Sequence, residues 1–268
     1  MSRFSAFAFN KHLQSLHISK TIMVFALMLV PSLAMADRRI FAKTYPYMTL
    51  PKGGFEIEHY LDADLRRVDD PDTHLIENGY RPAWTMQVEF EYGITDRLDF
   101  GFYTVFRQKA YQDFELRGVK LRSRYRLFDE GVLPVDTALY LELVYYGDEV
   151  KIEEIIILAR KFGSVETAVN FKFEEEFKLK GPETEFEFVF VPSVGVGYHF
   201  NPNVSLGLEW QGKLKVEHGE AEDFINYLGP VISVAGNHFF WTVLVAAQLN
   251  GVDDGVGIQA RSLFGVQF

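Results

Sequence analysis

The sequence predicts an all-β protein, an antiparallel transmembrane β-barrel of about 12 strands with short periplasmic turns and longer extracellular loops. Three observations support this fold class. Large apolar residues alternate with polar ones along most of the chain, which is typical of strands with one face toward lipid and one toward water. The 268 residues include 25 Phe and 13 Tyr, yet the mean hydropathy is only -0.03. The last predicted strand carries the chain to a terminal aromatic residue, Phe268.

Residues 1–36 have the features of an export signal. Three basic residues and no acidic ones accompany an apolar run at residues 21–30, and Pro31 and the small-residue site Ala34-Met35-Ala36 follow. An uninterrupted run of this length is too short to span a membrane, so we expect cleavage rather than an anchoring helix. We therefore divide the chain into a signal peptide at 1–36, a short periplasmic lead-in at 37–54 and a barrel at 55–268.

The composition excludes several function classes. Without residues 1–36 the chain has 24 Lys plus Arg against 37 Asp plus Glu, a formal charge of -13. Such an acidic chain is a poor candidate for binding nucleic acid, which relies on clustered basic residues. The chain has no cysteine, which rules out disulfides, thiolate metal sites and covalent haem attachment. We expect no cofactor.

Twelve alternating segments follow the lead-in. The clearest are the second and third, where Trp84, Met86 and Val88 begin an apolar face that resumes after a tight turn. The sixth segment is apolar on both faces and the tenth is less regular, so their registers stay open. The segments lie at residues 55–61, 84–93, 98–107, 119–127, 135–145, 152–161, 165–174, 184–198, 204–213, 227–235, 241–249 and 255–268.

The connections between segments favour a membrane barrel over a soluble one. Those after even-numbered segments are short, whereas several others are longer and acidic, notably residues 62–81 and 217–226. This asymmetry is typical of outer-membrane barrels. A soluble β-sandwich or lipocalin-like barrel would also alternate. It would need to bury four or five large apolar residues from each of a dozen strands, which is more than one core holds.

Charged residues on the predicted inward faces are the candidate functional site. A basic ladder on residues 119–127 would face acids on both neighbouring segments. A transverse field in a narrow lumen would then orient polar solutes and select ions. Alternatively, the charges pair across strands and simply fill the interior. The candidate lumen residues are Lys120, Arg122, Arg124, Arg126, Glu89, Glu91, Asp99, Asp136, Glu142 and Arg107.

Dedicated metal and catalytic sites are not expected. The acid clusters in the predicted loops lack the spacing of a calcium loop, so we interpret them as solvated. The run Glu174-Glu175-Glu176, together with Glu183, Glu185 and Glu187, is interpreted in the same way. Some outer-membrane barrels are lipid-modifying enzymes, but nothing here reproduces the closely spaced His-x-Ser motif of the outer-membrane phospholipases. His199 and His238 fall at predicted periplasmic turns, away from the outer leaflet.

Three stretches resemble known outer-membrane proteins. Phe264, Val266 and Phe268 resemble the C-terminal strand of bacterial outer-membrane barrels, which implies an assembly signal read by the barrel-assembly machinery. The stretches TLPKGGFEIEHYLD, from Thr49, and EYGITDRLDFGFY, from Glu91, resemble the barrels of the "MetA-pathway of phenol degradation" group and related transporters. This resemblance implies passage of small, including aromatic, solutes, and it carries over no catalytic residue.

The functional hypothesis is a porin-like channel in the outer membrane of a Gram-negative bacterium. It would pass small polar, charged or aromatic solutes and contact outer-membrane lipid and lipopolysaccharide, with no nucleic acid partner. The alternative is a closed structural or adhesion barrel whose extracellular loops bind a partner, and a lipid-modifying enzyme is a third class. The sequence leaves open the solute, the oligomeric state, and whether the lumen is open or plugged.

Overall fold

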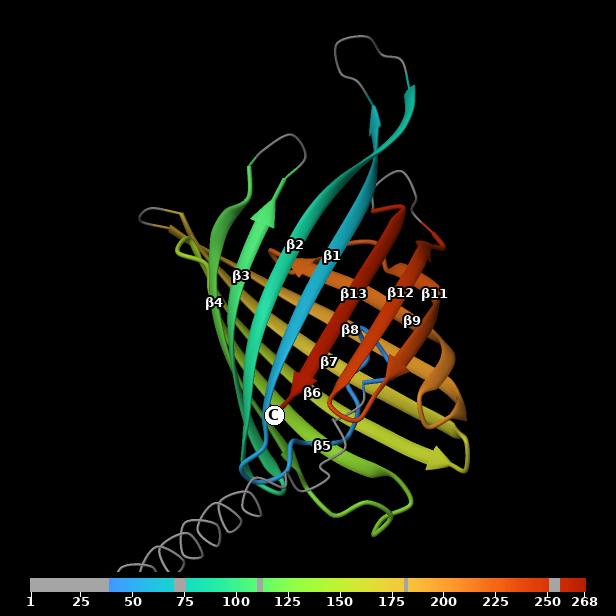
Figure 1. The fold of residues 1–268 in the computed structure, drawn as a ribbon. Helices are drawn as coiled ribbons and strands as arrows, with labels where there is room; N and C mark the ends of the chain where they lie inside the picture. Colours follow the sequence, from blue (N-terminus) through green and yellow to red (C-terminus); the bar gives the residue numbers. More distant parts are fainter. Residues whose placement is uncertain (1–38, 70–75, 110–112, 181–182, 251–255) are drawn as a thin grey trace, which may run out of the picture. The chain divides into compact units, whose positions relative to one another are not determined.

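The computed structural model describes residues 39–69, 76–109, 113–180, 183–250 and 256–268 (Figure 1). The predicted signal peptide lies outside these residues. The described part is all-β, and the strands are β1 (Phe55–Asp69), β2 (Ile76–Thr95), β3 (Leu98–Gln108), β4 (Glu115–Arg126), β5 (Asp136–Tyr145), β6 (Glu149–Phe162), β7 (Val165–Lys180), β8 (Glu183–Asn201), β9 (Val204–Glu217), β10 (Glu220–Ala221), β11 (Ile225–Ala235), β12 (Phe239–Gln248) and β13 (Ile258–Gln267).

The strands form a closed antiparallel barrel. Each strand from β1 to β8 pairs with the next, β8 pairs with β9, and the ring continues through β11, β12 and β13 back to β1. Twelve strands make the ring, and the two-residue β10 only extends the end of β9. The predicted fold class is therefore confirmed. Within the described ranges, no helix has the length and hydrophobicity needed to cross a membrane.

The two faces of the wall are those that the alternation predicts. On β5, Leu139, Leu141 and Leu143 point outward and are 43 to 50% exposed, whereas Tyr140 and Glu142 point inward and are buried. This arrangement is the reverse of that in a soluble β-barrel, because the apolar face lies outside and the polar face lines the lumen. The same division holds for the exposed Phe264 and the buried Leu263 of β13.

The structure settles the two open registers. On β6, Ile155 and Ile157 point inward and are buried, and Ile156 points outward. On β11, Tyr227 is buried inside while Leu228 is exposed. The sixth segment is apolar on both faces because its inward residues pack in the lumen rather than meeting water.

Several strand ends differ from the prediction. β1 and β2 together form a hairpin that extends well beyond the predicted segments 55–61 and 84–93. At the other end of the chain, β13 begins at Ile258 rather than at 255. Val256, which alternation assigns to the lipid face, is instead buried in an apolar cluster with Tyr227. Alternation does not apply there because Val256 precedes the strand.

Residues 39–50, here called the inner segment, run inside the ring of strands (Figure 1). Ile40, Phe41 and Leu50 are at most 1% exposed. Ile40 and Phe41 belong to an apolar cluster that includes inward residues of β7, β11 and β12, such as Val231. A Cβ atom at Gly195 on β8 would lie 2.7 Å from the Phe41 ring, so the missing side chain makes room for it.

The inner segment forms much of the predicted periplasmic lead-in, residues 37–54. Its inward path was not predicted. The segment has neither strand nor helix periodicity, so the sequence does not indicate which of its side chains are buried. The barrel therefore encloses a piece of its own chain.

Candidate functional site

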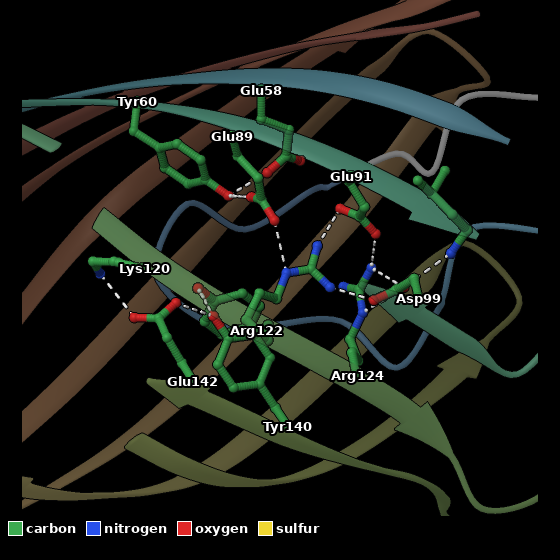
Figure 2. A network of polar contacts seen from close by, with 12 residues as sticks. Glu58, Tyr60, Glu89, Glu91, Asp99, Lys120, Arg122, Arg124, Tyr140 and Glu142 are labelled. Atoms are coloured by element: carbon green, nitrogen blue, oxygen red, sulfur yellow. Dashed lines mark hydrogen bonds and ion pairs between the residues drawn. The ribbon is translucent and has the colours of Figure 1, made fainter. Parts of the chain in front are cut away.

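A network of buried ion pairs joins β2, β3 and β4 on the inner wall (Figure 2). Arg122 Nε donates to Glu89 at 2.7 Å, and its other nitrogens pair with Glu91 and Asp99. Arg124 Nη2 lies 3.0 Å from both Glu91 and Asp99. All five side chains belong to residues at most 3% exposed. Each charge is thus compensated by its neighbours rather than by water.

The strand register explains why these side chains meet. Asp99 lies opposite Arg124, and Arg122 lies opposite Gly101, which in turn faces Glu91. A Cβ atom at Gly101 would lie 2.3 Å from a Glu89 carboxylate oxygen, so glycine is required for this close approach. Cross-strand pairing therefore brings the predicted basic ladder and its acidic neighbours together.

The inner segment and β1 extend this network. The Tyr60 hydroxyl lies 2.9 Å from the Glu89 carboxylate and also contacts Glu58. Arg39 Nη1 donates to the Tyr60 hydroxyl at 2.7 Å and to Glu58 at 3.2 Å. Sequence reasoning missed Arg39, because it precedes the predicted barrel.

Lys120 and Glu142 lie at the edge of the network. Lys120 Nζ donates to Glu142 at 2.8 Å, and the Tyr140 hydroxyl donates to the same carboxylate at 2.6 Å (Figure 2). Both Lys120 and Glu142 also line the cavity described below. They are the two predicted lumen residues that face open space in the barrel.

The other three predicted lumen residues lie apart from the network. Arg126 bonds the carbonyl oxygen of Asp96 and lies over the Tyr47 ring, 5.5 Å from its centroid. Asp136 accepts a hydrogen bond from the backbone of Gly131 at 2.7 Å, at the start of β5. Arg107 is exposed near the opposite end of β3.

The inner segment is held by side chains of the barrel wall. The Glu209 carboxylate on β9 accepts three backbone hydrogen bonds, from Ala42 at 2.6 Å, Lys43 at 2.9 Å and Thr44 at 2.8 Å. Asn170 on β7 bonds both the backbone nitrogen and the carbonyl oxygen of Tyr45. One carboxylate thus satisfies three consecutive donors that would otherwise be unpaired inside the barrel.

A cavity of about 240 Å³ lies in the lumen beside the inner segment. Its walls come from both the inner segment and strands around the ring. Five basic and three acidic side chains line it, together with amides, hydroxyls and two aliphatic residues. The lining residues are Lys43, Tyr45, Tyr60, Gln87, Tyr103, Lys120, Glu142, Glu153, Ile155, Asn170, Lys172, Glu174, Val191, Ser193, Gln211, Lys213, Gln259 and Arg261.

A second set of ion pairs forms the β6 and β7 side of this cavity. Lys172 lies 3.6 Å from Glu153 and also pairs with Glu174. Lys151 lies 3.4 Å from Glu174 and 2.7 Å from Glu176. The interpretation of these acids as solvated is wrong for Glu174, which is 7% exposed and paired with both lysines, and for Glu187, which is buried and paired with Lys178 and Lys215.

Among the described residues, two groups of carboxylates come close enough to hold a metal ion. Glu56, Glu58 and Glu91 form one, and Glu185, Glu187 and Glu217 form the other. Basic residues already pair with members of both: Arg39, Arg122 and Arg124 in the first, and Lys178 and Lys215 in the second.

A row of three polar side chains crosses β7, β8 and β9. Ser205 Oγ lies 2.8 Å from His199 Nδ1, and His199 Nε2 lies 2.9 Å from Glu166. The residue types are those of a serine hydrolase. Ser205 is completely buried, however, so its hydroxyl is not reachable by a substrate in this structure.

Some ion pairs involve exposed carboxylates in the connections between strands; their partner Arg97 also lies in a connection, whereas Arg117 lies on β4. Arg97 bonds Asp129 at 3.1 and 2.5 Å, and this pairing raises the pKa of the Arg97 guanidinium. Arg117 bonds Asp148 at 2.7 Å, and this hydrogen bond lowers the pKa of the Asp148 carboxyl. Such exposed pairs add little to stability.

Fold and interior together define the class of the protein: a twelve-stranded barrel of the outer-membrane type, with an apolar outer wall and a charged, partly filled lumen. No protein-family model matches the chain, and no curated protein matches it in sequence.

Solved structures share the fold at low identity. The COG4313 outer membrane channel from Pseudomonas putida F1 is 11% identical with a TM-score of 0.60, and the match covers 84% of this chain and 100% of that one. NanC porin is 7% identical with a TM-score of 0.52, covering 80% and 98%. KdgM porin is 11% identical with a TM-score of 0.51, covering 80% and 98%. The finer resemblance to the phenol-degradation group stays a prediction.

Proposed function

We propose that the chain is a porin-like channel of the outer membrane of Gram-negative bacteria. One observation carries the proposal: the polar lumen holds a cavity lined by charged and amide side chains, inside a barrel whose outer wall is apolar. Polar solutes need such a path because the bilayer core offers no partner for their hydrogen bonds. The structures with similar folds include channels and porins, which agrees with this use of the barrel.

The inner segment would set the width of the passage. It occupies the interior that twelve strands would otherwise leave open, so we expect a narrow path for small polar or charged solutes. The buried Arg122 and Arg124 would then hold the wall together, while cavity-lining residues such as Lys120 and Glu142 meet the solute. Aromatic solutes remain a prediction from the family resemblance.

The remaining partners belong to the same proposal. The outward residues Phe264 and Phe268 would contact lipid, and with Val266 they would form the signal for the barrel-assembly machinery. Phe268 is 71% exposed, and its backbone nitrogen bonds the carbonyl oxygen of Phe55, which joins the two ends of the barrel. Lipopolysaccharide would surround the end of the barrel with the longer loops.

Conductance in a planar bilayer tests the channel. The mature chain, refolded and shown by gel shift on heating to be a folded barrel, should give steady, small conductance steps. Silence from the folded barrel would contradict the proposal.

A closed structural or adhesion barrel is the second candidate. It is favoured by the filled interior and by the length of the β1 and β2 hairpin. Shortening this hairpin should abolish binding of a partner if the second candidate holds, and should leave solute flux intact if the first does.

A further inference from the structure

The cavity in the lumen has an excess of positive charge that the chain does not compensate. Lys120 pairs with Glu142, Lys172 pairs with Glu153 and Glu174, and Arg261 bonds Asp62 at 2.7 Å. Lys43 and Lys213 complete the basic lining. Neither of these two lysines forms an ion pair with a described residue. Two ammonium groups thus line one cavity without a carboxylate of the described residues at ion-pair distance.

The surroundings of Lys43 strengthen this point. Its Nζ donates to the amide oxygen of Gln259 at 2.8 Å, which is a neutral partner. Burial acts most strongly against its charge, Arg261 and Lys172 repel it, and Asp62 and Asp64 attract it. An anion placed beside Lys43 would remove repulsion that the chain itself leaves in place.

The cavity also offers neutral hydrogen-bonding groups. Ser193 and Gln211 face each other across β8 and β9, and both line the cavity. A hydroxyl and an amide side by side offer donors and acceptors to a ligand that carries hydroxyl groups.

We propose that this cavity binds a small hydroxylated carboxylate, of the size of a six-carbon sugar acid, with its carboxylate held by Lys43 and Lys213 and its hydroxyls bonded by Ser193 and Gln211. The proposal names the solute class of the proposed channel and rests on it in that respect. The binding site itself requires only the folded barrel.

Isothermal titration of the folded, detergent-solubilised mature chain tests this site, with gluconate as the probe. Sorbitol matches gluconate in carbon number and hydroxyls but has no charge, and acetate has the charge without the hydroxyls. Gluconate should bind more tightly than either control. Equal binding of sorbitol, or of acetate, would overturn the assignment.

Two variants locate the site. Lys43→Gln and Lys213→Gln should each weaken gluconate binding roughly tenfold, which is the usual effect of losing one charge-assisted hydrogen bond. Lys52→Gln is the matched control, because Lys52 is exposed at the end of the lead-in. Each variant must retain the heat-modifiable fold. Unchanged affinity in both cavity variants would contradict the proposal.

Conductance of the same preparations separates the two proposals. Gluconate binding without conductance would support the site and contradict the channel. Conductance without gluconate binding would support the channel and contradict the site.

Discussion

Two groups of basic residues in the same lumen have different surroundings. Arg122 and Arg124 are enclosed by carboxylates and buried, whereas Lys43 and Lys213 line the cavity without an ion pair to a described residue. The inner segment contributes to this difference because it covers part of the network. The backbone nitrogen of Leu50 donates a hydrogen bond to Asp99 there. Inward-facing charge in a barrel therefore has two uses: it holds strands together where it is covered, and it can bind solutes where it is not.

The largest expected effect comes from breaking the covered group. Arg122→Ala would leave Glu89, Glu91 and Asp99 buried with one cation fewer, and should lower the free energy of unfolding by about 3 to 5 kcal/mol. The measurement is reversible urea unfolding in lipid vesicles. Arg126→Ala is the control, since Arg126 bonds a backbone carbonyl near a turn.

Equal, small losses of unfolding free energy in both variants would show that the buried network adds no more stability than the exposed Arg126 contact. A double variant, Arg122→Met with Glu89→Gln, should recover part of the loss because it removes opposite charges together.

The next effect concerns the inner segment. Glu209→Ala removes the acceptor of three backbone hydrogen bonds, so the amides of Ala42, Lys43 and Thr44 should lose protection from hydrogen exchange. Amides in the β3 and β4 ladder, across the ring from Glu209 on β9, are the internal reference. Retained protection at residues 42–44 would mean that apolar packing of Ile40 and Phe41 alone holds the segment.

A smaller effect is expected for ion selectivity. Lys213→Gln removes an unpaired cation from the cavity and should shift the reversal potential in a salt gradient toward cation selectivity. Lys52→Gln should leave it unchanged, because Lys52 does not line the cavity. A shift in the control as large as that in Lys213→Gln would show that the cavity does not control selectivity.

The smallest effect belongs to the exposed turn. Arg97→Ala removes the pair with Asp129, which lies in solvent, and should leave the urea midpoint unchanged within error. A clear loss of stability would show that the Arg97–Asp129 pair contributes more than exposed ion pairs usually do.

Alternation predicted the wall but not its filling. The twelve segments, their outward faces and the acids around Arg122 and Arg124 follow from a period of two, because neighbouring strands put inward residues side by side. Which charges are covered depends on the inner segment, and no local pattern predicts its path. Its signals were present: Ile40 and Phe41 are apolar in a segment predicted to be outside the barrel, and Gly195 leaves space on β8.

The filled interior also could not be derived from the candidate residues. A stripe of Lys120, Arg122 and Arg124 is equally consistent with a selectivity filter and with paired charges. Only distances separate these uses, such as the 2.7 Å from Arg122 to Glu89. The roles of Arg39 and Glu209 were not predicted, because both depend on the path of the inner segment.

The central claim is that the inner segment sets the passage, and single-channel conductance of Glu209→Ala beside the unaltered chain tests it most directly. Gly195→Leu, which should push Phe41 from its place, gives an independent second route to the same release. We predict a several-fold larger conductance in both variants. Conductance equal to that of the unaltered chain, with exchange data showing the segment released, would contradict the claim.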